Sequence, residues 1–439
     1  MTPKKSRKHL SADALFKQIH DGFEKLKDNT ISSTRFSLTD ILMSGFAMFS
    51  LKEPSLLSFD ERRTTDKNLK NIYHIEHIPS DTYMRTRLDE VEPTNLRPLF
   101  RDVFRQLQRG KVLEPFVFMN NCYLLSLDGT GYFSSDKIHC ESCLEKKNKK
   151  TGKITYSHQI LGAAIVHPDF KEVIPLAPEP IIKQDGENKN DCERNSAKRF
   201  FEMLRREHPH LQLIITEDGL SSNAPHVRDL HRHNLHYILG VKPGDHSYLF
   251  QYVETAHQAG QTTEFEIKIN DIIHRFRFLN QVPLNASNQD LLVNFLEYWE
   301  IKPNNKIQHF SWVTDFVIRK HNVYDIMRGG RARWKIENET FNTLKNQGYH
   351  FEHNFGHGKK HLSVVFACLM MLAFLVDQAQ QLGCELFGAV LKKLKRKTRL
   401  WERIRSLFEN FEIDSMETLY KAILYGYEIK ELVILDKSA

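Results

Sequence analysis

Three acidic residues stand where they could share one metal site. Asp128 ends the apolar run "YLLSLD", and Asp218 ends "LQLIITED". Each run has the pattern of a buried strand, and open sheets place their ligands at the carboxyl ends of such strands. Glu337 stands in "WKIENETFNTLKN", on the same helical face as Trp334 and Phe341. A carboxylate on an apolar face is costly unless a partner compensates its charge.

Three carboxylates at one sheet edge would repel each other unless a cation offset their charge. Oxygen ligands select hard cations such as Mg²⁺ or Mn²⁺. Two such ions about 4 Å apart can activate a nucleophile and stabilise the leaving oxygen of a phosphodiester. Taken singly, each residue also fits an ordinary role, since an Asp before Gly is often a turn residue. Glu217 and Glu339 are the alternative acids. Glu217 would point to the opposite face of the strand from Asp218, and Glu339 would point away from the helical face that carries Glu337.

The elements around these residues have the order expected of a ribonuclease-H-like fold. Three predicted strands, "CYLLSLDGTGYF", "ITYSHQILGAAIVH" and "KEVIPLAPEPI", precede an alternation of helix, strand, helix and strand. The first of those helices would start near Cys192, with Asn190 or Asp191 as its cap. Three antiparallel strands that feed alternating units predict a mixed sheet with helices on both faces. Alternating apolar residues then predict a mostly β insertion before the helix of Glu337.

We therefore predict an α/β fold in five segments: a ribonuclease-H-like mixed sheet, interrupted by a β-rich insertion, with a helical N-terminal domain and a helical C-terminal tail. Residues 1–118 form the N-terminal domain, for DNA binding or assembly. The first part of the core covers 119–244, the insertion 245–325 and the last core helices 326–385. Residues 386–439 form a basic helical C-terminal region.

The charge and composition of the chain favour a nucleic-acid partner. The 439 residues carry a net charge of +7, gathered in "TPKKSRKHL" and "LKKLKRKTRLWERIR". Such clusters suit a phosphate backbone, although solvated surfaces explain them equally well. The first thirty residues lack a secretory pattern. The apolar run 362–376 is short for a membrane span and favours a buried core helix. Six cysteines make no disulfide framework here, so we expect a reducing, intracellular compartment.

The stretches "SLDGTGYF", "ITEDGLSSNAPHV" and "GRARWKIENETFNTLKNQGYHFEHNFGHG" resemble the signature regions of insertion-sequence DDE transposases of the cut-and-paste group with a β-rich insertion. The resemblance covers roughly residues 120–375. It implies that Asp128, Asp218 and Glu337 are the catalytic triad and bind two Mg²⁺ or Mn²⁺ ions. It also implies strand cleavage at transposon ends and strand transfer into target DNA by a homodimer bound to double-stranded DNA with terminal inverted repeats. A cytoplasmic, nucleoid-associated location in a prokaryote would follow from the same resemblance. An inactive transposase-derived DNA-binding protein and a metal-dependent nuclease without strand joining are the alternatives.

That group carries a Tyr, Arg, Glu and Lys signature around its last acid. Arg333 stands four residues before Glu337, as the signature asks, but Gly330 occupies the Tyr position and Lys345 comes one residue late. The resemblance implies that Arg333 and Lys345 contact phosphates of the transposon end. Weaker candidates for DNA contact, all with ordinary structural roles as alternatives, are Arg331, Lys335, Trp299 and Trp312; the two tryptophans could stack on an extruded base.

Cysteine and histidine residues form two further patterns. A zinc site is conceivable in "HCESC" and across the adjoining hairpin, from His139, Cys140, Cys143 and His158. One CxxC pair is a modest signal, and we favour plain hairpin packing. In "FEHNFGHG", His353 and His357 stand four apart, but the glycines favour a turn. We expect a structural or DNA-backbone contact there rather than a metal.

Overall fold

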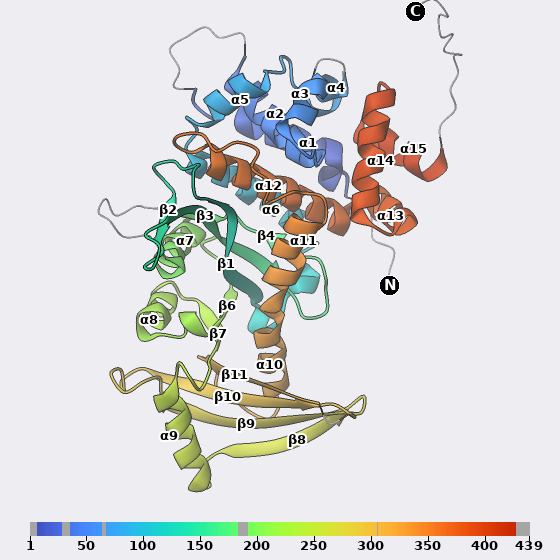
Figure 1. Ribbon diagram of the computed structural model, residues 1–439. Coiled ribbons are helices and arrows are strands. Elements are labelled where there is room, and N and C mark those ends of the chain that lie inside the picture. The colour runs from blue at the N-terminus through green and yellow to red at the C-terminus, as the bar shows by residue number, and fades with distance from the viewer. Residues whose placement is uncertain (1–6, 29–35, 64–66, 183–191, 305, 427–439) are drawn as a thin grey trace, which may run out of the picture.

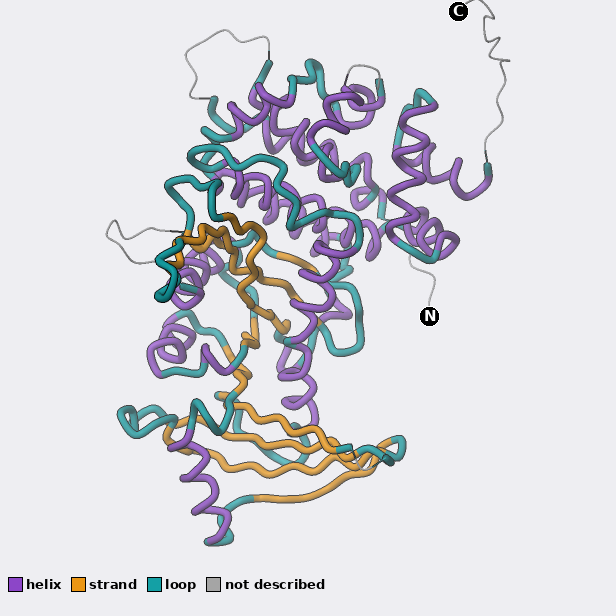
Figure 2. Tube along the Cα trace, in the orientation of Figure 1, coloured by secondary structure: helices purple, strands orange, loops and turns teal. Residues whose placement is uncertain are grey.

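The computed structural model describes residues 7–28, 36–63, 67–182, 192–304 and 306–426. Helices from both ends of the chain gather at one end of the molecule, and the strands within residues 263–314 lie at the other (Figures 1 and 2). The basic residues 2–6 and the cap candidates Asn190 and Asp191 lie outside the described residues.

The helical end combines N-terminal and C-terminal segments. Ser11 and Ser37 cap the first two helices, as their sequence predicts, because each hydroxyl accepts a hydrogen bond from a backbone N–H in the first turn. The helices are α1 Ala12–Phe23, α2 Leu38–Ser50, α3 Leu56–Arg63, α4 Asn68–Tyr73, α5 Asp81–Leu88, α6 Arg97–Arg109, α12 Leu362–Gly383, α13 Glu385–Leu394, α14 Lys397–Asn410 and α15 Met416–Tyr425.

Helix α12 is the core of this end. It is long and apolar enough to cross a membrane by length and composition, yet its apolar stretch is 100% buried within the protein. It packs against α2, α6 and β4 and so joins the helical end to the sheet. This agrees with the buried core helix that the sequence predicts.

The core strands have the predicted ribonuclease-H-like arrangement. Strand β1 lies antiparallel to β3 and parallel to β6, and β6 lies parallel to β7. The third predicted strand is split into two short strands, β4 and β5, and β2 was not predicted; all three pair with β3. The bounds are β1 Tyr123–Ser135, β2 Leu144–Lys147, β3 Ile154–Val166, β4 Ile174–Pro175, β5 Glu179–Ile181, α7 Glu193–Glu207, β6 Leu213–Glu217, α8 Ala224–Arg232 and β7 His236–Gly240.

The predicted insertion extends the same sheet. Its last strand, β11, pairs antiparallel with β7, so that Thr314 lies opposite Ile238. The described strands therefore form one 11-stranded sheet rather than a core sheet beside a separate β domain. The four strands were predicted, but the helix that precedes them was not. The bounds are α9 Ser247–Gln258, β8 Thr263–Ile269, β9 Ile272–Pro283, β10 Leu292–Ile301 and β11 Ile307–Thr314.

The helical segment that carries Glu337 lies directly on the sheet (Figure 1). It comprises α10 (Val323–Ala332), the π-helical η6 (Ile336–Phe341) and α11 (Asn342–Asn346). A Cβ atom at Gly329 would lie 2.8 Å from Ile238 of β7, and one at Gly162 would lie 2.7 Å from the ring of Phe341. Because these glycines have no side chain, the helix backbone and the sheet approach closely.

We expect Gly162→Ala to lower stability by about 1–3 kcal/mol, because the added methyl group forces the Phe341 ring away from β3. Equilibrium unfolding in urea measures the change. Gly131→Ala is the matched control: it also lies in a central strand, and its Cβ would meet other atoms only at 3.9 Å. Equal stability of the two variants would contradict the close packing at Gly162.

Candidate active site

Strand register places Asp128 and Asp218 side by side. The parallel pairing of β1 with β6 ends at Ser126 opposite Thr216. Asp128 stands two residues further along β1, and Asp218 stands two residues after Thr216, directly after the end of β6 in extended backbone. Residues two apart in a strand point to the same face, so both carboxylates follow the side of Ser126 and Thr216. Strand β1 continues to Ser135, paired with β3, close to the extent of the predicted strand "CYLLSLDGTGYF". Asp128 therefore lies within the strand rather than at its carboxyl end, where it was predicted to lie.

The three predicted acids line one cleft. Asp128, Asp218 and Glu337 border a cavity of about 400 Å³, together with Arg333 and Trp334 from the junction between α10 and η6. The hydroxyl of Ser126 donates a hydrogen bond of 3.0 Å to the backbone oxygen of Arg333. This bond ties the junction to β1, two residues before Asp128.

Asp128 lies in an environment that disfavours its negative charge. Burial raises its pKa from 3.8 to about 6; the guanidinium of Arg333, whose Nη1 lies 3.4 Å from the carboxylate, opposes this, and the charges of Asp218 and Glu337 add to it. One arginine thus faces several carboxylates. Converging carboxylate oxygens with excess negative charge are a donor set that suits a hard divalent cation.

Asp218 and its neighbour Glu217 have different surroundings. Asp218 caps the short 3₁₀ turn η5 (Gly219–Ser221), where one carboxylate oxygen accepts the Leu220 N–H at 3.0 Å. Glu217 is buried, and its carboxylate lies 2.6 Å from Nε2 of His226. Burial lowers the pKa of His226, but the charge and the hydrogen bond of Glu217, together with the charge of Asp229, outweigh burial, and the pKa is raised. Glu217 is therefore engaged in a buried pair, which leaves Asp218 as the better placed ligand.

Glu337 lies in a π-helical turn, and this changes which residues share its face. Ile336 and Phe341 are buried and stand five apart, the spacing of a π-helix. Trp334 was predicted to anchor the helix on the sheet, but its side chain is 47% exposed. The prediction failed because it assumed α-helical spacing throughout. The guanidinium of Arg333 lies 4.4 Å from the centre of the Trp334 ring.

Glu339, the alternative acid, lies on another side of the helix. Burial lowers the pKa of Lys335, and the negative charge of Glu339 opposes this shift. Glu339 does not border the cleft. The ammonium of Lys335 donates a hydrogen bond of 2.6 Å to the backbone oxygen of Phe170. Lys335 is thus engaged away from the three acids.

The π-helical turn also accounts for the position of Lys345. A π-turn holds one more residue than an α-turn, so the eighth residue after Glu337 takes the place that the seventh has in an α-helix. Lys345 forms an ion pair of 2.9 Å with Glu352. Arg331 pairs with Glu300, and its guanidinium lies 4.9 Å from the centre of the Phe310 ring. Neither cation borders the cleft.

Trp312 fills the space next to the position where the signature asks for Tyr. A Cβ atom at Gly330 would overlap the pyrrole edge of the Trp312 indole, so a larger side chain does not fit there. Trp312 is 5% exposed and stacks on Phe310 at 5.9 Å, although it borders the cleft. Trp299 stacks on His309 at 5.0 Å. Among these aromatic residues, Trp334 has the most accessible ring beside the acids.

Sequence reasoning missed a fourth carboxylate. Glu193, in the first turn of α7, lies against Gly129, where a Cβ atom would overlap its carboxylate. Burial raises the pKa of Glu193, and the charges of Asp128 and Asp218 raise it further. The only sequence signal was the "DGTG" after Asp128, since a glycine within a strand often marks a close approach.

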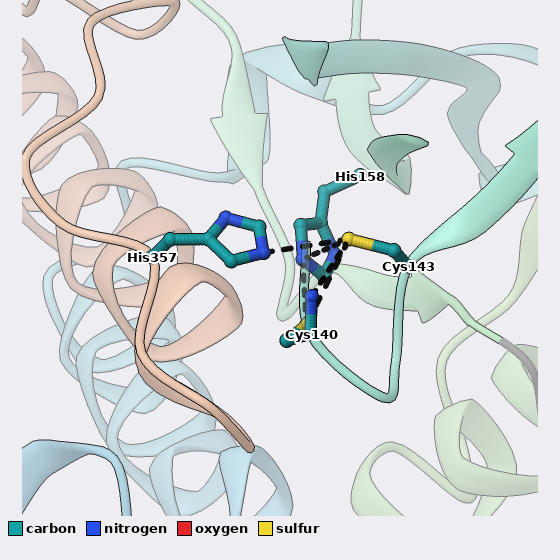
Figure 3. Close-up of side chains that lie close together, drawn as sticks. All are labelled: Cys140, Cys143, His158 and His357. Atoms are coloured by element: carbon teal, nitrogen blue, oxygen red, sulfur yellow. Dashed lines mark hydrogen bonds between the residues drawn. The ribbon is translucent and has the colours of Figure 1, made fainter. Parts of the chain in front are cut away.

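The two cysteine and histidine patterns meet in a second cluster. Cys140, Cys143 and His158 lie together as the zinc hypothesis proposed, but His139 does not belong to the set. It is exposed and stacks on Tyr156 at 4.4 Å. The fourth member is His357 from "FEHNFGHG" (Figure 3). Plain hairpin packing therefore does not describe this region, because a distant segment reaches into the hairpin.

Comparisons with known proteins add a limited finding. No protein-family model matches the chain, and no curated protein matches it. Among solved structures, the chain is similar to the piggyBac transposase in a cryo-EM structure of its synaptic complex with hairpin DNA. The two are 11% identical, the alignment covers 95% of this chain and 81% of that chain, and the TM-score is 0.43. A similarity of this degree does not establish a shared activity.

We expect Asp128→Asn to stabilise the metal-free protein at pH 8 by about 1–3 kcal/mol, and at pH 5 by only about half as much. The pKa of Asp128 is raised on folding, so the folded state binds more protons, and stability falls as the pH rises from about 4 to about 6. Asn removes the charge that causes this loss. Urea unfolding in the presence of a chelator measures both values. A variant that is less stable than the wild type at pH 8 would contradict the assigned environment.

We expect Gly330→Ala to lower stability by about 1–3 kcal/mol, although alanine normally favours a helix. The cause is the overlap with Trp312, so the same substitution should cost about 1 kcal/mol less in a Trp312→Leu background. Thermal and urea unfolding of the four proteins give this double-mutant cycle. Gly388→Ala in α13 is the control, because its Cβ meets no atom within 4 Å and it should be neutral or stabilising. Additive effects would exclude the Trp312 contact as the cause.

Proposed function

We propose that this chain is a DDE transposase that cleaves DNA strands at transposon ends and joins them to target DNA. The convergence of Asp128, Asp218 and Glu337 in one cleft of a ribonuclease-H-like sheet carries the proposal. The three sequence stretches that resemble the family's signature regions surround these same residues.

The donor set fits two Mg²⁺ or Mn²⁺ ions held by Asp128, Asp218 and Glu337. The fit rests on the burial of Asp128 among like charges, which one arginine offsets only in part. Glu193 lies close enough to influence Asp128 and could support the site from the side of α7. Ions bound here would supply activation of the attacking oxygen and stabilisation of the leaving oxygen of a phosphodiester.

The cleft offers distinct groups to a DNA strand. Arg333 is held by Asp128 and by the face of Trp334, and it presents a forked guanidinium that suits phosphate oxygens. Trp334 presents an exposed ring on which a base can stack. Arg331, before these two residues, and Lys345, after them, lie on the same helical segment and would contact phosphates further along the DNA strand. Trp312 would line the wall of the cleft.

The proposed partners follow from the reaction. Double-stranded DNA would enter as transposon ends with terminal inverted repeats and as target, and pairing of two ends requires a homodimer in the active complex. The basic segment 391–405 would add phosphate contacts. We propose a cytoplasmic, nucleoid-associated location for such a protein.

A cleavage and joining assay tests the function. The purified chain is incubated with Mg²⁺ or Mn²⁺, a donor DNA that carries the sequences flanking its gene, and a plasmid target. We expect cleavage at the ends and joined products, and a loss of about a hundredfold or more in Asp128→Asn, Asp218→Asn and Glu337→Gln. Glu339→Gln is the matched control on the same helical segment and should stay within a few fold of the wild type.

Each other outcome of this assay has a defined meaning. Cleavage without joining would indicate a metal-dependent nuclease, and end binding without cleavage would indicate a DNA-binding protein without catalysis. Full activity of Asp128→Asn, or loss of activity in Glu339→Gln alone, would overturn the assignment of the acids.

A further inference from the structure

Two cysteines and two histidines point their ligand atoms at one spot (Figure 3). The two Sγ atoms of Cys140 and Cys143 lie 3.8 Å apart. Nε2 of His158 lies 3.3 Å from Cys140 Sγ and 3.4 Å from Cys143 Sγ, and Nε2 of His357 lies 3.4 Å from Cys143 Sγ. All four ligand atoms lie within 4.8 Å of one another.

These spacings match the edges of a zinc tetrahedron. Bonds of about 2.3 Å to sulfur and about 2.0–2.1 Å to nitrogen give edges of roughly 3.3–3.8 Å between ligand atoms. The two sulfur atoms are much too far apart for a disulfide, whose S–S bond is about 2.05 Å. The cysteines also form the tight turn of a CxxC unit, in which the Cys140 N–H lies 3.4 Å from Cys143 Sγ.

Both histidines are buried, with Nε2 turned toward the sulfur atoms. His158 and Cys143 are almost completely buried, and His357 is 7% exposed. Both rings turn Nε2 toward the sulfur atoms, while both Nδ1 atoms are buried without a hydrogen-bond partner among the described residues. Ordinary hydrogen bonding would favour a ring orientation that satisfies Nδ1 as well. A common ion at the centre of the four atoms explains why both rings point inward.

The geometry points to a structural zinc site formed by Cys140, Cys143, His158 and His357. Soft sulfur and imidazole ligands select zinc over Mg²⁺ or Mn²⁺, so this site and the carboxylate cleft would bind different metals. Four protein ligands fill a tetrahedral shell and leave no open position for a substrate, which makes the role structural rather than catalytic.

The proposed ion would join three distant segments. Cys140 and Cys143 lie in the turn between β1 and β2, His158 lies on β3, and His357 lies in the loop between α11 and α12. His158 precedes by four residues Gly162, the glycine against which Phe341 packs. Zinc would therefore fasten the chain that follows the Glu337 helix to the strand on which that helix rests. The ring of His357, 4.3 Å from that of Phe133, packs at the same place.

Metal analysis of the whole chain tests the site. Protein purified without chelator, and supplied with one equivalent of Zn²⁺, is analysed by elemental mass spectrometry. A parallel Co²⁺-loaded sample is examined for the visible bands of tetrahedral cobalt and the ultraviolet band of a cobalt–thiolate bond. We expect about one zinc per chain and both cobalt signatures. A thiol-modifying reagent should release the zinc from the wild-type protein in step with the loss of two cysteines.

Variants distinguish the ligands from their neighbours. Cys143→Ser and His357→Ala should bind less than about a third as much zinc, and His357→Ala should still show an altered cobalt spectrum that retains thiolate bonds. His139→Ala and His353→Ala, which change the adjacent histidines, should bind as much zinc as the wild type. Asp128→Asn should also keep its zinc, which separates this result from the carboxylate cleft.

Several results would overturn the proposal. One is a wild-type chain that holds no zinc after reconstitution, or that shows a native Cys140–Cys143 disulfide by mass. Another is zinc lost in His139→Ala but kept in His357→Ala. Zinc lost in Asp128→Asn but kept in Cys143→Ser would place the ion among the carboxylates instead. None of these results bears on strand cleavage, so the zinc site and the proposed function stand or fall separately.

Discussion

The candidate active site depends on how closely one helical segment approaches the sheet. Gly162 is the cross-strand partner of Asp128, and the ring of Phe341 rests where a Gly162 side chain would be. Glu337, one π-turn before Phe341, is thereby held at the level of Asp128. A longer side chain at this contact would lift the helix and separate carboxylates that come from distant parts of the chain. The small size of one residue on β3 thus sets the geometry of a site in which it contributes no functional group.

The clustered carboxylates destabilise the folded, metal-free protein. Burial and the acidic neighbours raise the pKa of Asp128 to about 6, and the positive charge of Arg333 compensates only part of the repulsion. Such a site is poorly stable until a cation enters, which is the usual relation between stability and function at a charged centre. The rigid frame beneath it, made by close helix packing and by the Ser126 hydrogen bond, keeps these charges together in the metal-free protein.

The sequence predicted the fold class and the convergence of the three acids on one cleft because strand order and hydrophobic periodicity are local signals. It failed where geometry depends on distant partners. The exposed Trp334 and the offset of Lys345 both follow from a π-turn, which leaves no reliable mark in sequence. The pairing of β11 with β7 could not be predicted because it joins segments that local patterns treat independently. His357 lies 214 positions from Cys143, so spacing rules for zinc motifs cannot find it.

The positions of the two ligand sets lead to one mechanical conclusion. The Glu337 segment is fixed near its start where Gly330 meets Trp312, and at its middle where Phe341 meets Gly162. Beyond its C-terminal end, Phe351 packs on Tyr132 of β1, with ring centres 5.4 Å apart, and His357 then reaches the antiparallel pair of β1 and β3. A metal at that point would add an attachment to these three packing contacts along the chain. The sulfur and nitrogen donors would then act on the carboxylates indirectly, by limiting how far the helix that carries Glu337 can move from Asp128.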